Sequence, residues 1–264
     1  MGSHRRTRMR TGLGFKAAVA GNTPQVEQFF DRLITLPSPT DQAAYATFIN
    51  ALVSDGTFAA HDALCVLGAP DAGSSFTELT SGKFTPILDV VTGIPTFTAY
   101  RGWTGFAAPT QCDINSNFNP STAGGHYTQN AASVGGWNLQ TVQNNSTLWR
   151  DQSDTDIECW PLYSDAHTYT QINDGTEIGT VAGIPDGSGW FSISRTASNL
   201  YTVKRNNALL ASPTTTSRAL VNSNIYFGGA GQILAAYSIG ALSPSQETTL
   251  YNALFALLHG WGAV

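Results

Sequence analysis

Apolar residues recur at helical spacing in the first part of the chain. A capping residue followed by proline, the pattern that begins a helix, occurs at Thr23-Pro24 and again at Ser38-Pro39. The first predicted helix ends at Leu36-Pro37 and the second at Asp55-Gly56, and a short third segment spans residues 57–67. The apolar faces of the two helices consist of Val26, Phe29, Phe30, Leu33 and Ile34, and of Tyr45, Phe48, Ile49 and Leu52.

A further helix is predicted near the other end of the chain. Ser243-Pro244-Ser245-Gln246 combines a capping serine, a proline at the first helical position and a glutamine three residues after the serine, which is the pattern of a capping box. We expect this helix to pack against the sheet or the N-terminal helices. Its apolar stripe consists of Leu250, Leu254, Leu257, Leu258 and Trp261.

From about residue 75 the pattern changes to short segments in which apolar and polar residues alternate. Residues 167–172 and 176–181 flank Asn173-Asp174-Gly175, which predicts a β-hairpin. A second hairpin is predicted around Arg205-Asn206-Asn207. Further short strands follow at a spacing of roughly ten residues, which is typical of a β-sandwich.

These patterns divide the chain into four parts. Residues 1–22 are predicted to be a flexible basic arm, and residues 23–67 an N-terminal helical segment. Residues 68–241 form the predicted sandwich, and residues 242–264 a C-terminal helix that packs on the body. The expected fold class is therefore mainly β, with helices at both ends.

Composition and charge argue against a nucleic-acid-binding protein and exclude a transmembrane protein. Residues 1–16 hold five of the 13 basic residues and no acidic residue, so the remaining chain has 8 basic against 18 acidic residues. A body with that negative balance is a poor match for nucleic acid, whose binding requires phosphate neutralisation. No apolar run approaches the roughly 20 residues of a membrane helix, so we expect no insertion into a membrane.

The three cysteines do not form a recognisable framework. Cys65, Cys112 and Cys159 are odd in number and widely spaced, which fits neither a set of disulfides nor a zinc motif. Cys65 lies in an apolar segment and is predicted to be a buried thiol. A bridge between Cys112 and Cys159 is left open by the sequence.

Several strand segments resemble the concanavalin A-like, laminin-G-like jelly-roll domains. The motifs are GWFSISRT at residues 189–196, NLYTVKRN at 199–206 and NIYFGGA at 224–230, and the alternating segment 233–239 follows them. Asn207 replaces the glycine that usually follows the asparagine of the second motif, and asparagine tolerates the positive φ of such a turn. The resemblance implies a jelly-roll sandwich.

A second set of segments is similar to a bacteriophage and prophage virion family, whose members place helices before such a jelly roll. These segments are ALCVLGA at residues 63–69, PTFTAYRGW at 95–103 and FNPS at 118–121. The resemblance implies a virion structural or surface protein: a decoration, head-fibre or tail-associated subunit, assembled in the host cytoplasm. Its expected partners are other virion subunits, including further copies of itself in a homo-oligomer.

One acidic segment is a candidate for chemistry. Asp154, Asp156 and Glu158 would share one face of a strand and resemble the E-x-D-x-E strand of retaining jelly-roll glucanases, with Asp154 where glutamate is expected. Glycoside hydrolysis is therefore an alternative function, although a polar loop explains the segment better and no catalytic residue is assigned. The same segment offers Asp151, Asp154 and Asp156 as oxygen ligands for calcium, the one cofactor considered.

Exposed tryptophans beside amide side chains are candidates for carbohydrate recognition, because indole faces stack on sugar rings and amides bond to hydroxyls. The segment from Trp137 to Trp149 is rich in asparagine, whereas Trp190 and Trp261 are predicted to lie in the core. A surface glycan of the host is the expected ligand, either for a virion protein or, alternatively, for a carbohydrate-binding module. The candidate residues are Trp137, Asn138, Asn144, Asn145 and Trp149.

Overall fold

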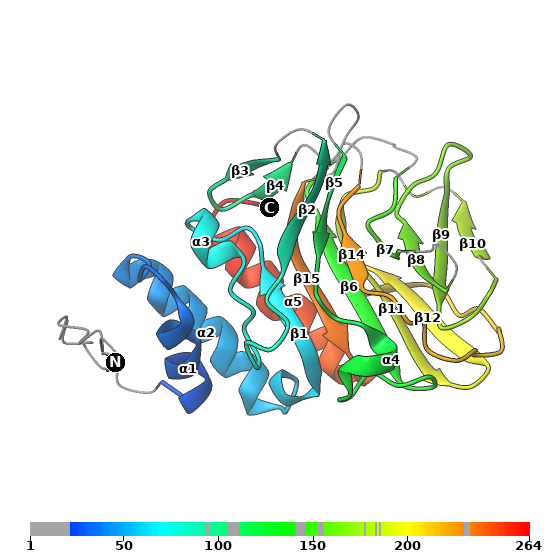
Figure 1. Ribbon diagram of the computed structural model, residues 1–264, viewed down its shortest axis with the longest axis horizontal. Helices are drawn as coiled ribbons and strands as arrows, with labels where there is room; N and C mark the ends of the chain where they lie inside the picture. The colour runs from blue at the N-terminus through cyan, green and yellow to red at the C-terminus, as the bar shows by residue number, and fades with distance from the viewer. Residues whose placement is uncertain are drawn as a thin grey trace, which may run out of the picture.

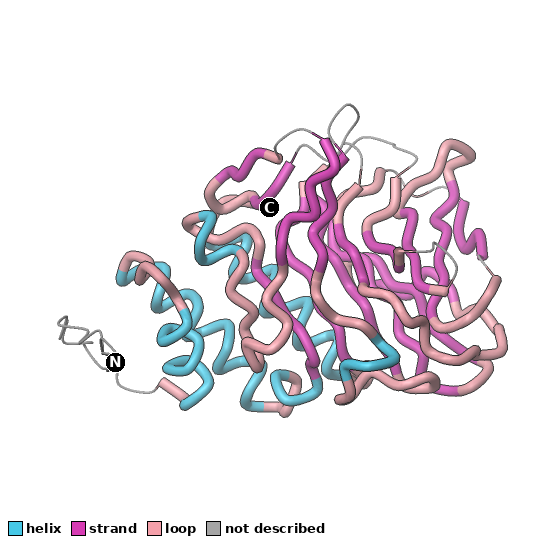
Figure 2. The backbone as a smooth tube through the Cα atoms, viewed as in Figure 1, coloured by secondary structure: helices cyan, strands magenta, loops and turns pink. Residues whose placement is uncertain are grey.

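Two antiparallel β-sheets face each other, and helices cover the outer surface of one of them (Figure 1; Figure 2). This architecture is observed in a computed structural model that describes residues 22–92, 95–104, 111–140, 146–152, 156–176, 178–182, 184, 186–229 and 233–264. The chain is mainly β and forms a jelly-roll sandwich, which confirms the predicted fold class.

The sheet beneath the helices is called sheet A. Its strands lie in the order β13-β12-β11-β6-β15-β4-β3, and β1 also pairs with β15. The strands of sheet A are β1 (His61–Val66), β3 (Thr96–Thr98), β4 (Gly102–Thr104), β6 (Ala132–Asn138), β11 (Gly189–Ala197), β12 (Leu200–Arg205), β13 (Ala208–Ala211) and β15 (Leu234–Gly240).

The opposing sheet is called sheet B, and its order is β10-β9-β8-β7-β14-β5-β2. Neighbouring strands in both sheets are antiparallel. The strands of sheet B are β2 (Ile87–Thr92), β5 (Gln111–Asn115), β7 (Trp149–Asp151), β8 (Ile157–Trp160), β9 (His167–Ile172), β10 (Ile178–Ala182) and β14 (Ile225–Phe227).

The long helices begin where the sequence predicts. Thr23 precedes α1 (Pro24–Arg32), Ser38 caps α2 (Pro39–Ser54), and Ser243 forms a complete capping box with Gln246 at the start of α5 (Pro244–Gly260). Proline follows the capping position in all three, because its fixed φ suits the first turn and its missing N–H is not needed there. The shorter helices are α3 (Ala72–Ser75), α4 (Pro120–Ala123) and the 3₁₀ turn η1 (Phe58–Ala60).

The segment expected to be helical over residues 23–67 is helical only as far as Ala60. Residues 61–66 form β1, which pairs along its length with β15. All six residues of β1 are buried, because α-helices cover one face of this strand and sheet B covers the other. The apolar run that begins at Ala63 does not alternate, and periodicity alone cannot distinguish it from a buried helical segment.

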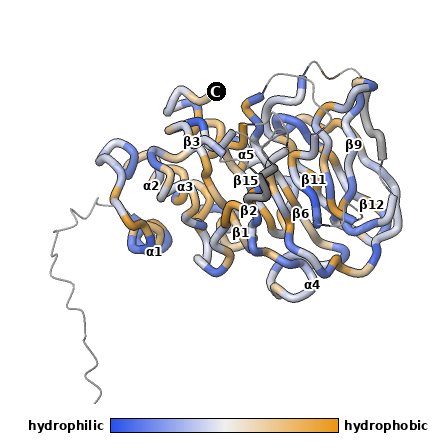
Figure 3. Tube along the Cα trace, turned by 45° about the horizontal axis from the view of Figure 1, so that its top comes forward, coloured by the Kyte–Doolittle hydropathy of each residue, from blue (hydrophilic) through white to orange (hydrophobic). Residues whose placement is uncertain are grey.

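Two hydrophobic cores hold the layers together. The first lies between the sheets and includes Ile193, Trp149 and Phe227, and the second lies between sheet A and helices α1, α2 and α5. Figure 3 shows hydrophobic segments along the strands and helices and hydrophilic segments mainly in the connections. Trp190 is fully buried in the second core, as predicted, and its ring occupies the space where Gly135 has no side chain.

Both predicted hairpins are present. Strands β9 and β10 pair with each other, and β12 and β13 pair across Asn206 and Asn207. Both of these asparagines have positive φ, at 48° and 62°, which matches the right-handed twist of a tight hairpin. Asparagine at position 207 therefore serves in place of the glycine that the jelly-roll motif usually has.

The cysteine pair that the sequence left open is not bridged. Cys65 and Cys159 are free, buried thiols, and burial raises the pKa of each. Cys159 lies on β8 and Cys112 on β5, with β7 and β14 between them. Three inter-strand steps amount to about 14 Å, which is beyond the reach of a disulfide.

Candidate functional site

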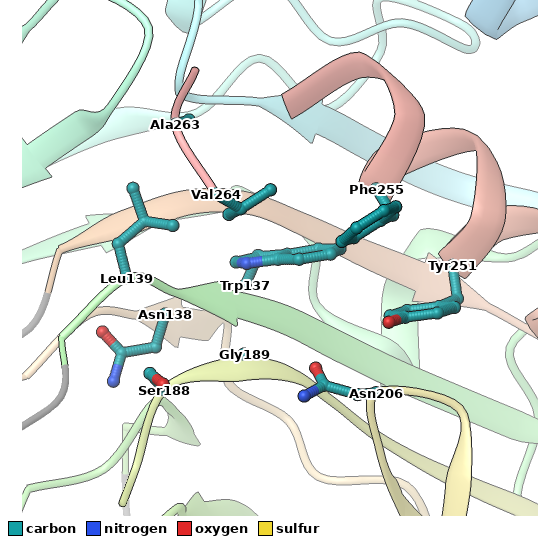
Figure 4. Close-up of a pocket in the computed structure, with 10 residues that line it drawn as sticks. All are labelled: Trp137, Asn138, Leu139, Ser188, Gly189, Asn206, Tyr251, Phe255, Ala263 and Val264. Carbon is teal, nitrogen blue, oxygen red and sulfur yellow. The ribbon is translucent and has the colours of Figure 1, made fainter. Parts of the chain in front are cut away.

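A pocket with a volume of about 260 Å³ lies where sheet A meets α5 (Figure 4). It opens at the surface between the end of β6, the start of β11, the β12–β13 turn and the last residues of the chain. Four segments that are distant in the sequence therefore meet here, since the last residues directly follow α5. The lining residues are Trp137, Asn138, Leu139, Ser188, Gly189, Asn206, Tyr251, Phe255, Ala263 and Val264.

Three aromatic rings form one wall of the pocket. The ring of Trp137 is parallel to that of Tyr251, with an interplanar angle of 1° and a centroid distance of 5.7 Å, and Phe255 lies 6.4 Å from the indole. Tyr251 and Phe255 are four residues apart on α5, so their side chains project from successive turns of one face. Trp137 is only 3% exposed, whereas Phe255 is 42% exposed. The accessible part of this wall therefore belongs mainly to the helix.

Amide and hydroxyl side chains lie on one side of the indole plane, where Figure 4 shows Asn138, Ser188 and Asn206. The Asn138 side chain joins three loops: its Nδ2 donates to Gly187 O at 2.8 Å, and its Oδ1 accepts from the backbone N–H of Gln140 and of Ile233. These bonds fix the end of β6 and hence the orientation of the neighbouring Trp137. Asn138 is a structural support of the pocket more than a free contact for a ligand.

Asn206 reaches the pocket through the tight hairpin turn. Its Oδ1 accepts a hydrogen bond from the backbone N–H of Trp190 at 2.9 Å. Gly189, which has a φ of +105°, makes this approach feasible, because a Cβ at that position would lie 2.4 Å from Asn206 Oδ1. A larger residue at position 189 would be strained and would displace the asparagine.

None of the described residues that line the pocket has a charged side chain. The two basic residues that precede Asn206 are both engaged: Arg205 pairs with Asp186 at 2.8 Å, and Lys204 pairs with Glu247 of α5. Partial burial favours a higher pKa for Asp186, but hydrogen bonds from Ser188 and the nearby Arg205 guanidinium outweigh it and hold the pKa below its usual value. The lining side chains are therefore uncharged, and the neighbouring Lys204 and Arg205 are each paired with a carboxylate.

This combination is suited to binding more than to acid–base catalysis. Among the side chains of the described lining residues, only that of Tyr251 is titratable, and none is a carboxylate, an imidazole or a thiol. Aromatic surface beside a few fixed amide and hydroxyl groups is the composition of sites that hold small polar ligands in a defined orientation. The volume is close to the lower end of ligand pockets, which fits one sugar-sized group.

The structure brings together two of the five predicted glycan contacts. Trp137 and Asn138 line the pocket, but Trp137 is buried and does not present an open indole face. Trp149 was expected to be exposed, and this is wrong: it is fully buried between the sheets and packs against Phe227. Successive side chains of β7 point to opposite faces of sheet B, and that of Trp149 points to the face that packs against sheet A. Asn144 and Asn145 lie outside the described residues.

The acidic segment is only partly described. Asp151 is fully buried, and its Oδ2 accepts from the backbone N–H of Asp156 and Ile157, which closes the β7–β8 connection. Glu158 lies on β8 and accepts from the Trp160 indole N–H at 3.1 Å. Asp154 lies outside the described residues.

The described part of the chain contains no group of three His, Cys, Asp or Glu residues placed to hold a metal ion. Calcium binding by Asp151, Asp154 and Asp156 stays a prediction, because Asp154 is not described. The same holds for hydrolysis by Asp154, Asp156 and Glu158.

Sequence reasoning missed the contribution of the last helix. It treated α5 as a leucine stripe facing the core, and Leu250, Leu254, Leu257 and Leu258 are indeed buried. Tyr251, Phe255 and His259 form a second, aromatic stripe at four-residue spacing, in which neighbouring rings stack in turn. That spacing was a readable signal. Ser188 and Asn206 carried no such signal, because only the folded sheet places them beside the helix.

Comparisons with known proteins support the fold. No family model matches the chain, and no curated protein matches it. Domain 4 of AbnA, a GH43 extracellular arabinanase from Geobacillus stearothermophilus, solved in complex with arabinotriose, is similar over 72% of this chain and 98% of its own, with 17% identity and a TM-score of 0.52.

The botulinum neurotoxin serotype D binding domain is also similar, over 78% of this chain and 53% of its own, with 12% identity and a TM-score of 0.54. The same ligand-binding domain in complex with N-acetylneuraminic acid gives 12% identity, a TM-score of 0.52 and coverage of 76% and 52%. At these identities the likeness establishes the fold alone. The structural neighbours are jelly-roll domains of the carbohydrate-binding and receptor-binding kind.

Among the described residues, no helix combines the length and the apolar character needed to cross a membrane.

Proposed function

We propose that this chain is a non-enzymatic carbohydrate-binding domain and that the pocket at Trp137, Tyr251 and Phe255 holds the sugar. The observation that carries the proposal is a pocket lined by uncharged side chains, in which an aromatic wall that is accessible mainly at Phe255 faces fixed amide groups. Sugars present both apolar C–H faces and hydroxyl groups, and this wall and these amides complement the two. The structural neighbours solved with arabinotriose and with N-acetylneuraminic acid support the same class of ligand.

The experiment is a glycan array with the intact protein and with Phe255→Ala. Phe255 is 42% exposed, so its removal takes away ring surface from the pocket with a small effect on the fold. The matched control is Ile87→Ala, which removes an apolar side chain of similar exposure. Ile87 lies on β2 at the edge of sheet B, whereas the pocket lies at sheet A and α5. Loss of binding in Phe255→Ala but not in Ile87→Ala is expected. Equal binding by both variants would remove this pocket as the site.

We further propose that the domain acts on a virion surface as a homo-oligomer. Two features support this: the resemblance of three segments to a phage and prophage virion family, and an apolar groove of about 270 Å³ between α2 and α5. Its small side chains, which include Ala44, Ala51, Ala253 and Ala256, allow another surface to approach closely. Apolar concavities of this kind are typical of protein–protein contacts.

Light scattering tests the oligomer. The intact protein is expected to give a defined multiple of 28.0 kDa. Ala256→Glu places a charge at an exposed position of the groove and is expected to dissociate the oligomer. Ala43→Glu places the same charge at an exposed position of α2 outside the lining and is expected to leave the oligomer intact. A monomer in all three cases would refute the oligomer and leave the glycan proposal unaffected.

A further inference from the structure

We propose that the pocket selects a neutral N-acetylated hexosamine, with the acetamido group held at the end formed by Trp137, Leu139 and Val264. This inference rests on the proposed function of the pocket and names the class of sugar that its walls accept. Three observations carry it: the position of the indole N–H, the donors left available beside it, and the pairing of the surrounding charges.

The first observation concerns one end of the pocket. Figure 4 shows the indole nitrogen of Trp137 at the end of the ring that points toward Leu139 and Val264, with Phe255 and Tyr251 on the opposite side. A hydrogen-bond donor and two aliphatic side chains therefore meet at the same place. An acetamido group carries the matching pair, a carbonyl oxygen that accepts and a methyl group that prefers apolar contact. A plain hydroxyl matches the donor but offers nothing to the aliphatic wall.

The second observation concerns which polar groups of the pocket are still available. No hydrogen bond joins the indole N–H of Trp137, or the side-chain amide N–H₂ of Asn206, to another described residue. The other half of the Asn206 amide is engaged, since its Oδ1 accepts from the Trp190 N–H. The hydroxyl of Ser188 donates to Asp186. The N–H groups of Trp137 and Asn206 are therefore donors to which the ligand must supply acceptors, and the Tyr251 hydroxyl can donate or accept.

The third observation concerns charge. A sialylated sugar carries a carboxylate, which requires a cation or several donors to offset the cost of leaving water. Arg205 and Lys204 precede Asn206 of the lining, and both are held by carboxylates, Asp186 and Glu247. The ring of His259 stacks on Phe255 but does not line the pocket. Recruiting either of them would leave its partner carboxylate unpaired. The pocket therefore disfavours an anionic sugar and accepts a neutral one.

The test compares three methyl glycosides with the intact protein: N-acetylglucosamine, glucose and N-acetylneuraminic acid. Binding is followed by titration of the tryptophan indole N–H signals in ¹⁵N-labelled protein, with the Trp137 signal assigned from the Trp137→Phe variant. N-acetylglucosamine is expected to shift the Trp137 signal and to bind at least about tenfold more tightly than glucose, which is what one apolar contact of methyl size contributes. N-acetylneuraminic acid is expected to leave the signal unchanged.

Two variants separate the parts of the argument. Leu139→Ala alters a half-buried wall residue and is expected to reduce the affinity for N-acetylglucosamine by a larger factor than the affinity for glucose. Asn206→Asp keeps the oxygen that accepts from Trp190 but removes the donor, and it is expected to weaken both neutral sugars by about fivefold, the value of one hydrogen bond. Asn207→Asp adds the same charge in the same turn outside the lining and serves as the control.

The outcomes are distinguishable. Equal affinity for glucose and N-acetylglucosamine, or an equal loss of affinity for both in Leu139→Ala, overturns the acetamido assignment while the pocket still binds sugar. A shift of the Trp137 signal by N-acetylneuraminic acid overturns the neutrality argument. If no sugar, free or arrayed, binds in a way that depends on Phe255, the proposed function itself fails and the selectivity argument fails with it.

Discussion

Replacing Trp137 by alanine tests whether this residue is scaffold or open binding surface. Its ring lies between sheet A and α5, with Trp190 at 6.1 Å and Tyr251 at 5.7 Å, and it is 3% exposed. Loss of a large buried aromatic side chain costs about 3–5 kcal/mol in free energy of unfolding. Phe255 is 42% exposed, and its truncation costs about 1–2 kcal/mol from the smaller apolar area that it buries.

The measurement is urea denaturation of Trp137→Ala, Phe255→Ala and the intact protein, followed by far-ultraviolet circular dichroism. Trp137→Ala is expected to lose about 2–3 kcal/mol more than Phe255→Ala, in line with the difference in buried area. Trp137→Phe keeps an aromatic ring in the stack, so its loss in free energy of unfolding is expected to lie between those of Trp137→Ala and Phe255→Ala. A free energy of unfolding for Trp137→Ala within about 1 kcal/mol of the intact protein would show that the ring is not part of the core.

Three further predictions follow from buried polar groups. Burial lowers the pKa of His61 to about 4, so the free energy of unfolding should fall by about 3 kcal/mol as the pH decreases from 6.5 to 4. Urea titrations at several pH values measure this change, and the free energy of unfolding of His61→Asn should depend less on pH. Asp174→Asn leaves the fully buried Arg195 guanidinium without its carboxylate and should lower the free energy of unfolding by about 3–5 kcal/mol in the same denaturation assay. A loss below about 1 kcal/mol would contradict the pairing. No polysaccharide should be hydrolysed; reducing ends released by the intact protein but not by Glu158→Gln would refute a purely binding role.

The His61 prediction depends on the direction of the shift. The pKa of an exposed histidine is 6.5, so below that pH the unfolded chain takes up a proton that the folded chain resists. The folded state is therefore favoured above pH 6.5 and loses that advantage progressively down to pH 4. His61 Nδ1 lies 2.8 Å from Thr57 O, and the asparagine amide can keep this bond without titrating.

Local patterns were sufficient for the elements that are stabilised by neighbours in sequence. Thr23, Ser38 and Ser243 marked helix starts because capping is decided within one turn. Asn206 and Asn207 marked a hairpin because few residues accept positive φ. The mainly β class followed from repeated short alternating segments. Residues 61–66 escaped this reasoning, because a strand covered on both faces has no alternation to read.

The binding site depends on contacts that no local pattern contains. Whether a tryptophan is exposed depends on which layer covers its face of the sheet. Helix α5 covers Trp137, and sheet A covers Trp149. The pocket exists because β6, the β12–β13 turn and α5 meet in space, although about seventy residues separate Trp137 from Asn206. Amphipathic periodicity indicates that one face of an element is buried, but the packing of the whole chain determines which other element covers that face. For this reason the class of fold could be read from the residues in order, and the location of the site could not.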